Sequence, residues 1–283
     1  MILDNLLTGS EKKIPISQHG NIEFVKCDVN NYNQLTDIFL SHQFHTVFHF
    51  AAVVGVKRTL DRPLLVLNDL NGMRLLLNLC ATSKVKRVYY SSSSEVYGEP
   101  VEFPQNERTT PLNSRLPYAI VKNAGEAFLK AYQKEYDMDY TVFRFFNTYG
   151  PKQSPDFVIS RFIRAALKNE DLHINGDGSQ TRTFCYIDDN IETCVKCFEQ
   201  DKYINDVINI GSDAEFSILQ LAQEIIRITG SRSKIIFVPA LTEGDMSRRK
   251  PDNSTMMQLL NRELLPLEKG IQKILENPAF ILE

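Results

Sequence analysis

A tyrosine and a lysine four residues apart are the side chains of this sequence best suited to do chemistry together. They are Tyr118 and Lys122, and they come after a serine-rich run that extends from Ser91 to Gly98. On a helix, residues four apart share a face, so the ammonium of Lys122 can lie near the phenol of Tyr118 and favour its phenolate. A tyrosine activated in this way can act as a base. The spacing alone also arises by chance, so the surrounding segments must support this interpretation.

Short apolar strands alternate with helical stretches through the first half of the chain. We expect strands at 1–3, 22–25, 46–50, 87–92 and 140–144, and helices at 33–42, 64–82 and 117–136. This alternation predicts an α/β fold, a doubly wound parallel sheet with helices on both faces. Ligands of such folds bind at the carboxyl ends of the strands. The segments Phe50–Val54 and Ser91–Glu95 both fall at such ends and define the expected site.

The pattern becomes less regular after Pro151. Helices are expected at 157–168, near 188 and at 217–229, with a turn-rich stretch at 175–180. We therefore expect one domain over residues 1–150 and a smaller C-terminal lobe over residues 151–283, with some of its segments returning to the sheet.

Composition excludes several classes of function. With 43% apolar residues, 24% charged residues and a net charge of -3, the chain has material for a core and lacks a nucleic-acid-binding surface. The odd number of cysteines, together with no signal peptide or long apolar run, indicates a cytoplasmic protein that does not bind a membrane. Cys194 and Cys197 are expected to pack within a helix, and His42, His45 and His49 to be strand or loop residues, so no metal site is predicted.

Eight segments in sequence order carry a resemblance to a known family. They are Asp4-Asn5, Cys27 to Val29, Val47 to Ala52, Lys86 to Gly98, Tyr118 to Lys122, Arg144 to Pro151, Gly176 to Phe184 and Arg248 to Asp252. Together they resemble the extended short-chain dehydrogenase/reductase family, in particular its nucleotide-sugar epimerases, dehydratases and decarboxylases. The resemblance implies a Rossmann-like NAD-binding domain over residues 1–150 and a mainly substrate-binding lobe over residues 151–283.

NAD is the cofactor that this resemblance implies. The positions that match the family's cofactor contacts are Asp4, Asn5, Asp28, Val29, Ala51, Ala52, Tyr118 and Lys122. An acid at the end of the second strand would bind the adenosine ribose, and the two alanines would lie beside the nicotinamide. Alternatively, Asp4 is an ordinary acidic residue before a turn, and the two alanines only permit tight packing of the strand against the helix.

The family's sheet normally opens with a strand, a glycine-rich turn and a helix that binds the pyrophosphate. No such turn occurs in these 283 residues, and Met1-Ile-Leu-Asp4 is typical of the end of the second strand. We therefore expect the first β-α unit of the sheet to be missing. On that ground a non-catalytic remnant that binds a nucleotide sugar is an alternative to an active enzyme.

The resemblance also implies a substrate and a reaction. Tyr118 and Lys122, with Ser93 and Glu95, would be catalytic, and the nucleotide sugar would contact Ser94, Asn147, Arg182, Arg248 and Arg249. Tyr118 would take the proton of the sugar 4-hydroxyl while hydride passes to NAD, which gives a transient 4-keto sugar. Ser93 would orient the same hydroxyl.

Glu95 bears on the reaction that the 4-keto sugar undergoes. A simple 4-epimerase needs no carboxylate there, whereas a carboxylate near C5 serves dehydration or decarboxylation. The resembling 4,6-dehydratases carry Thr-Asp-Glu at Ser93-Ser94-Glu95, and UDP-glucuronate decarboxylases carry Thr-Ser-Glu and an Arg-Lys-Pro-Asp segment like that of Arg249 to Asp252. This favours decarboxylase- or dehydratase-type chemistry on a UDP- or dTDP-sugar. The sequence around Tyr118 is closer to epimerases and dehydratases, so a 4-epimerase stays an alternative.

Two further features come from the resemblance. Family dimers pack the tyrosine-bearing helix against its copy, which predicts a homodimer through the helix of Tyr118. The next helix-forming segment upstream usually carries Asn-x-x-Gly-Thr, and the equivalent here reads Asp69-Leu-Asn-Gly72-Met73 or is displaced by one residue onto Asn68.

Overall fold

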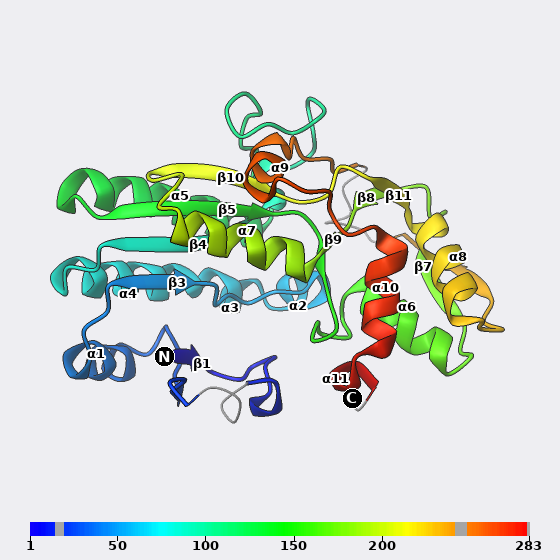
Figure 1. The fold of residues 1–283 in the computed structure, drawn as a ribbon, viewed down its shortest axis with the longest axis horizontal. Coiled ribbons are helices and arrows are strands. Elements are labelled where there is room, and N and C mark those ends of the chain that lie inside the picture. The colour runs from blue at the N-terminus through cyan, green and yellow to red at the C-terminus, as the bar shows by residue number, and fades with distance from the viewer. Residues whose placement is uncertain (15–19, 241–247, 282–283) are drawn as a thin grey trace. The chain divides into compact units, whose positions relative to one another are not determined.

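The computed structural model describes residues 1–14, 20–240 and 248–281 (Figure 1). The chain forms two compact units. Unit 1 comprises residues 1–92, 115–143 and 203–207, and unit 2 comprises residues 93–114, 144–202 and 208–283. Each unit has its own hydrophobic core.

Parallel strands build the sheet that dominates unit 1. The order is β10 (Asp206–Ile210), β5 (Asp139–Phe145), β4 (Arg87–Ser93) and β3 (Thr46–His49), and Figure 1 shows these strands running together across the view. β3 and β4 pair in parallel from Thr46 opposite Arg87 to His49 opposite Tyr90. A separate parallel pair joins β1 (Ile2–Asp4) to β2 (Phe24–Lys26). The predicted α/β class with a parallel sheet is confirmed.

Helices bury the apolar residues of unit 1. They are α1 (Tyr32–Ser41), α2 (Val56–Asp61), α3 (Pro63–Leu67), α4 (Asp69–Thr82) and α5 (Pro117–Tyr136), with a short 3-10 helix at Glu11–Lys13. α5 packs against α3 and α4. Its bounds agree with the predicted 117–136, because Pro117 suits the first helical position, where its missing N–H costs nothing. The helix expected at 64–82 is divided in two at Asn68.

A glycine allows α5 to approach β4 closely. A Cβ added at Gly125 would lie 2.3 Å from the hydroxyl oxygen of Tyr90. Any larger residue would push the helix away from the strand. Gly125 lies one turn after Lys122, so this contact helps to fix the position of Lys122 relative to β4.

Unit 2 consists of short strands and amphipathic helices around a second core. The strands are β6 (Thr148–Tyr149), β7 (Leu172–Asn175), β8 (Thr181–Thr183), β9 (Cys185–Tyr186), β11 (Glu215–Ser217) and β12 (Ile235–Val238). The helices are α6 (Val158–Leu167), α7 (Ile187–Glu199), α8 (Ile218–Thr229), α9 (Ser254–Leu260), α10 (Leu267–Glu276) and α11 (Pro278–Ile281), and a 3-10 helix spans Ser94–Tyr97. Ser217 and Gln220 form a capping box at the start of α8, and Gly230 ends that helix in the left-handed conformation.

The cysteine pair and the longest apolar segment both lie in helices. Cys194 and Cys197 are buried in α7, and burial raises the pKa of the Cys194 thiol. By length and composition alone, Pro63–Thr82 is the one segment within the described ranges that could cross a membrane. Met73 and Leu77 of this segment are buried in the core of unit 1, as in the core helix of a globular unit.

Candidate active site

The predicted pair lies on the first turns of α5 in unit 1. Lys122 is only 2% exposed although it carries a charge, and Tyr118 is half-buried beside Val53, Val66 and Val121. A buried ammonium must find partners, since burial without them costs several kcal/mol. The contacts of Lys122 therefore define the centre of the site.

The ammonium of Lys122 is held at the end of β4. Its Nζ donates to the backbone oxygen of Ser91 at 2.6 Å and to the hydroxyl of Ser91 at 3.3 Å. The same nitrogen lies 5.0 Å from the ring centre of Tyr90 and 5.8 Å from that of Tyr118. Lys122 and Tyr118 thus share a helix face as predicted, and a positive charge stands beside the Tyr118 ring.

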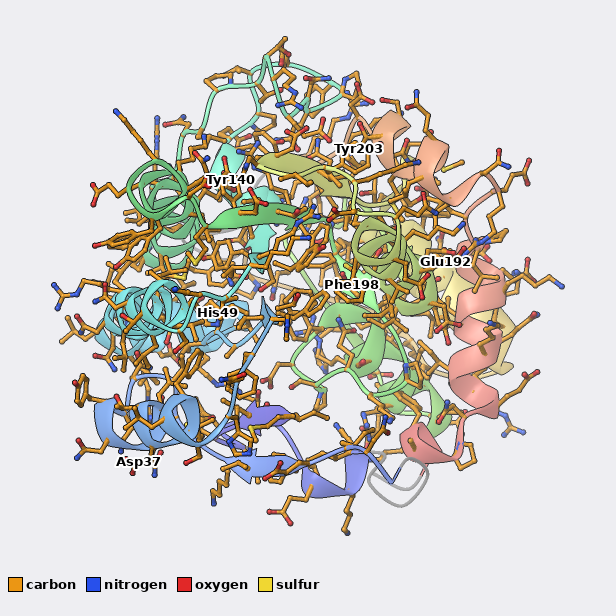
Figure 2. All side chains as sticks on the ribbon, turned by 60° about the vertical axis from the view of Figure 1, so that its left-hand side comes forward. Asp37, His49, Tyr140, Glu192, Phe198 and Tyr203 are labelled. Carbon is orange, nitrogen blue, oxygen red and sulfur yellow. The ribbon has the colours of Figure 1, made fainter. Side chains whose placement is uncertain are left out.

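Burial shapes the charges around Lys122. It lowers the pKa of Lys122 to about 8, against the opposing effect of the Asp69 carboxylate. His49, at the end of β3 and labelled in Figure 2, is buried and stacks on the ring of Tyr90. Burial and the charge of Lys122 lower the pKa of His49 to about 3. His49 is therefore neutral and Lys122 mostly protonated at pH 7.

Two small residues come directly after β3. Ala51 is exposed and Ala52 half-buried, so a flat group could approach their backbone. The next backbone N–H, that of Val53, donates to the Asp69 carboxylate at 2.8 Å. Asp69 begins α4 and anchors the segment that contains the two alanines.

The ends of β1 and β2 bring four predicted residues together. The side-chain amide of Asn5 donates to the Asp28 carboxylate at 3.1 Å, and the backbone N–H of Cys27 donates to the backbone oxygen of Asp4. The carboxylate of Asp4 accepts from the N–H of Leu6 and is exposed. Val29 packs against the core of unit 1.

Unit 2 contains a serine-glutamate turn paired with an arginine. Ser93 is the last residue of β4, and its hydroxyl accepts the N–H of Glu95, while Ser94 is buried. The guanidinium of Arg249 reaches Glu95 at 3.5 Å. Arg249 is 7% exposed, and its Nε has no hydrogen-bond partner among the residues that the structure describes. Glu95 and Arg249 are far apart in sequence, and the fold of unit 2 joins them.

Two other predicted substrate residues lie in unit 2, Asn147 just before β6 and Arg182 on β8. Asn147 has a positive φ of 35° and donates its amide to the backbone oxygen of Thr183 at 2.9 Å. Arg182, on β8, is buried and donates to the backbone oxygen of Thr181. The Thr183 hydroxyl is buried with no partner in the described part of the chain. Polar groups thus gather around β8.

Arg248 differs from its neighbour Arg249. It makes two hydrogen bonds to the Glu215 carboxylate, at 2.6 and 2.7 Å, and its guanidinium lies 4.2 Å from the ring centre of Phe103. Glu215 raises the pKa of Arg248. An incoming phosphate would have to compete with Glu215, so Arg248 is less available than the sequence suggested.

Three residues that contact the predicted site residues or their neighbours could not be predicted from the sequence. Ser91 was noted only as part of a serine run, Asp69 only as a departure from a motif, and Glu215 not at all. Each acts through a contact between segments distant in sequence, which local patterns do not reveal. The position of Ser91 at a strand end was the one usable signal.

Comparison with known proteins places this chain in a family. Residues 2–211 match the model of the "NAD dependent epimerase/dehydratase family". The chain belongs to this family. A UDP-N-acetyl-alpha-D-glucosaminuronate decarboxylase of Bacillus cytotoxicus is 35% identical in an alignment of length 271 that covers 91% of this chain and 83% of that protein.

Two solved structures share the fold of this family member. The UDP-glucose 4-epimerase of Thermotoga maritima with UDP-glucose has a TM-score of 0.91 and 30% identity, over 99% of this chain and 91% of that one. The UDP-glucuronic acid 4-epimerase of Bacillus cereus with UDP-glucuronic acid and NAD has a TM-score of 0.83 and 27% identity, over 97% and 90%. The predicted family, the Rossmann-like fold and NAD as the family's cofactor are confirmed.

The lowered pKa of Lys122 predicts a pH-dependent stability. Between the folded value of about 8 and the ordinary 10.5, the unfolded chain binds a proton that the folded chain lacks. The free energy of unfolding should therefore rise with pH in this window, by about 1.4 kcal/mol per unit from this group. In Lys122→Met the free energy of unfolding should lack this rise with pH.

Urea unfolding of both proteins between pH 7 and pH 10 measures the effect. Lys130→Met, on the exposed side of the same helix, is the control and should behave like the wild type. Parallel curves for the wild type and Lys122→Met would show that Lys122 keeps its ordinary pKa.

Proposed function

We propose that this chain is an NAD-dependent nucleotide-sugar enzyme that works through a transient 4-keto sugar and carries out decarboxylase- or dehydratase-type chemistry on a UDP- or dTDP-sugar. The observation that supports this reaction type is the pairing of Glu95 with Arg249 in unit 2. Unit 1 would serve NAD, and unit 2 the nucleotide sugar.

The residues of unit 1 fit NAD. The exposed Asp4 carboxylate suits the hydroxyls of the adenosine ribose, and Asn5, Asp28 and Val29 would border the adenine. Ala51 and Ala52 carry only methyl groups, so a nicotinamide ring could lie against them. When bound, NAD would accept a hydride from C4 of the sugar and later return it, so no other oxidant is needed.

Proton transfer would fall to Tyr118. Its phenol oxygen would take the proton of the 4-hydroxyl, because the nearby ammonium of Lys122 stabilises negative charge on that oxygen. Ser93 would accept or donate a hydrogen bond to the same hydroxyl and so orient it. Tyr118 would give the proton back when the ketone is reduced again.

Glu95 and Arg249 would act while the ketone exists. If the sugar is a uronate, it is then a β-keto acid: the C5–C6 bond breaks, carbon dioxide leaves, and the electron pair passes into the enolate of the ketone. Arg249 would stabilise the carboxylate and the enolate, and Glu95 would pass a proton from solvent to C5. If C6 carries a hydroxyl, Glu95 would remove the C5 proton as that hydroxyl leaves.

The residues next to Glu95 favour decarboxylation of a uronate over dehydration. Dehydration needs an acid for the departing hydroxyl, and Ser94 cannot supply a proton at neutral pH. Loss of carbon dioxide needs no such acid. The 35% identity to a decarboxylase of a UDP-uronate supports the same choice.

Asn147, Arg182 and Arg248 would bind the diphosphate of the nucleotide sugar, since amide and guanidinium groups donate to phosphate oxygens. We also propose a homodimer through α5, on which Ile120 is 41% exposed, and a cytoplasmic location. Both proposals rest on the resemblance as much as on this exposed side chain.

Tyr118→Phe tests the base. The protein should be incubated with NAD and, separately, with UDP-glucuronate, UDP-GlcNAc, UDP-glucose and dTDP-glucose, and the products identified by NMR. For any substrate that turns over, Tyr118→Phe should lower kcat by about 10²- to 10⁴-fold, because the proton acceptor is lost. Tyr136→Phe, the same change on the exposed end of α5, should leave kcat unchanged. Wild-type kcat in Tyr118→Phe would refute the role.

Glu95→Gln tests the step after oxidation. In a single turnover, reduced cofactor should still form, while product formation should slow by about 10²- to 10⁴-fold because the carboxylate no longer acts on the keto sugar. Glu99→Gln, an exposed glutamate in the same segment, is the matched control. A product rate equal to that of the wild type would leave simple 4-epimerisation as the better description.

A further inference from the structure

The carboxylate of Glu215, on β11, is surrounded by donors from two other segments of unit 2. Arg248 binds both of its oxygens, with Nε 2.6 Å from Oε1 and Nη2 2.7 Å from Oε2. The ammonium of Lys250 lies 3.5 Å from Oε2, and the hydroxyl of Thr181 donates to Oε1 at 3.5 Å. The hydrogen bonds of Arg248 and the two nearby cations lower the pKa of Glu215. Two cations and a hydroxyl thus converge on one oxyanion.

The same donors would suit a phosphate. A phosphate accepts two parallel hydrogen bonds from a guanidinium as a carboxylate does, and an ammonium can add a further charge-assisted bond. The cations, Arg248 and Lys250, outnumber the one acid, so the cluster keeps an excess of positive charge. It is therefore an oxyanion site that a carboxylate of the protein itself fills.

Strand pairing places this cluster beside Arg182, which the family resemblance also assigns to the substrate. β11 runs antiparallel to β8, with Phe216 opposite Arg182, and an isolated bridge joins Thr181 to Arg248. Since β11 is held to β8 by its backbone, the side chain of Glu215 could turn away from Arg248 without moving the strand.

The pair of Glu215 and Arg248 is partly open to water. The side chain of Arg248 is 42% exposed and that of Glu215 is 21% exposed. An ion pair of this exposure stabilises a protein little, because water screens its charges. A diphosphate, which carries more than one negative charge, can therefore replace the single carboxylate.

We propose that Glu215 is a counter-ion that occupies Arg248 and Lys250 in the free protein and releases them to the diphosphate of a nucleotide sugar. The carboxylate lowers the affinity for substrate and nucleotide product alike, since both contain the diphosphate. It thereby speeds the release of product. This inference rests on the proposed function and deepens it, because it names the residue that sets how tightly the diphosphate is bound.

The test is the binding of UDP and of inorganic pyrophosphate, measured by titration calorimetry in the absence of NAD. Glu215→Gln removes the charge of the carboxylate and keeps its size. Both ligands should bind about 3- to 10-fold more tightly to this variant than to the wild type, because Arg248 and Lys250 lose their internal partner. Uridine, which has no phosphate, should show no such gain.

Glu224→Gln controls for the loss of one surface charge. Glu224 pairs with Arg227 at 2.8 Å on α8, and Glu268 lies 2.9 Å from the same arginine, so there the acids outnumber the cation. This variant should bind UDP as the wild type does. Arg248→Met supplies a second background, in which Glu215→Gln should give a smaller gain in UDP affinity than it gives alone.

An affinity for UDP that is unchanged or weaker in Glu215→Gln would overturn the proposal, and a weaker one would mean that Glu215 holds Arg248 in place for the ligand. An equal gain with and without Arg248, or no binding of UDP and pyrophosphate by any of the proteins, would also overturn it. If Glu215→Gln does not fold, Glu215→Ala decides.

The result is separate from the fate of the proposed function. Tighter binding of UDP by Glu215→Gln, together with no turnover of any nucleotide sugar by the wild type, would refute the reaction and support the role of Glu215. Turnover by the wild type with unchanged UDP affinity in Glu215→Gln would do the reverse.

Discussion

A buried ammonium, that of Lys122, is the group on which the rest of unit 1 depends. The fold places it almost out of contact with water and surrounds it with the backbone oxygen of Ser91 and the rings of Tyr90 and Tyr118. Such a charge is tolerated only where its partners are fixed. The close approach at Gly125 and the hydrogen bonds of Asp69 fix them, so α5, β4 and the segment after β3 keep one arrangement. The same arrangement fixes the position of Tyr118, which lies one turn before Lys122 on α5.

The charged groups of unit 2 have different surroundings from Lys122. Its two consecutive arginines differ, because Arg248 pairs with Glu215 whereas Arg249 is buried against Glu95, and one nitrogen of Arg249 has no partner among the residues that the structure describes. An unpaired buried donor costs free energy in the free protein, and an anionic ligand that accepted from it would recover that cost. The structure thus separates two arginines that the sequence resemblance treats alike.

Part of this account could be predicted from the sequence because it depends on local signals. The bounds of α5 could be derived from Pro117 and the helical pattern, and the strand ends from apolar runs that stop at small or polar residues. The break at Asn68 was missed because the apolar pattern continues across it. The roles of Ser91, Asp69 and Glu215 could not be predicted, since their partners Lys122, Val53 and Arg248 lie in distant segments. For the same reason the sequence did not indicate that His49 is neutral.

The account's central claim is that Tyr118 serves a reversible oxidation at C4 of a nucleotide sugar. The most direct test is to trace deuterium placed at C4 of whichever sugar the protein converts, by mass spectrometry of the cofactor and of the product after a single turnover. The account predicts that the deuterium appears on the nicotinamide during the reaction and is found again in the product, at C4 of a decarboxylated sugar or at C6 of a dehydrated 4-keto sugar. Deuterium that stays at C4 throughout, with no label passing to the cofactor, would contradict it.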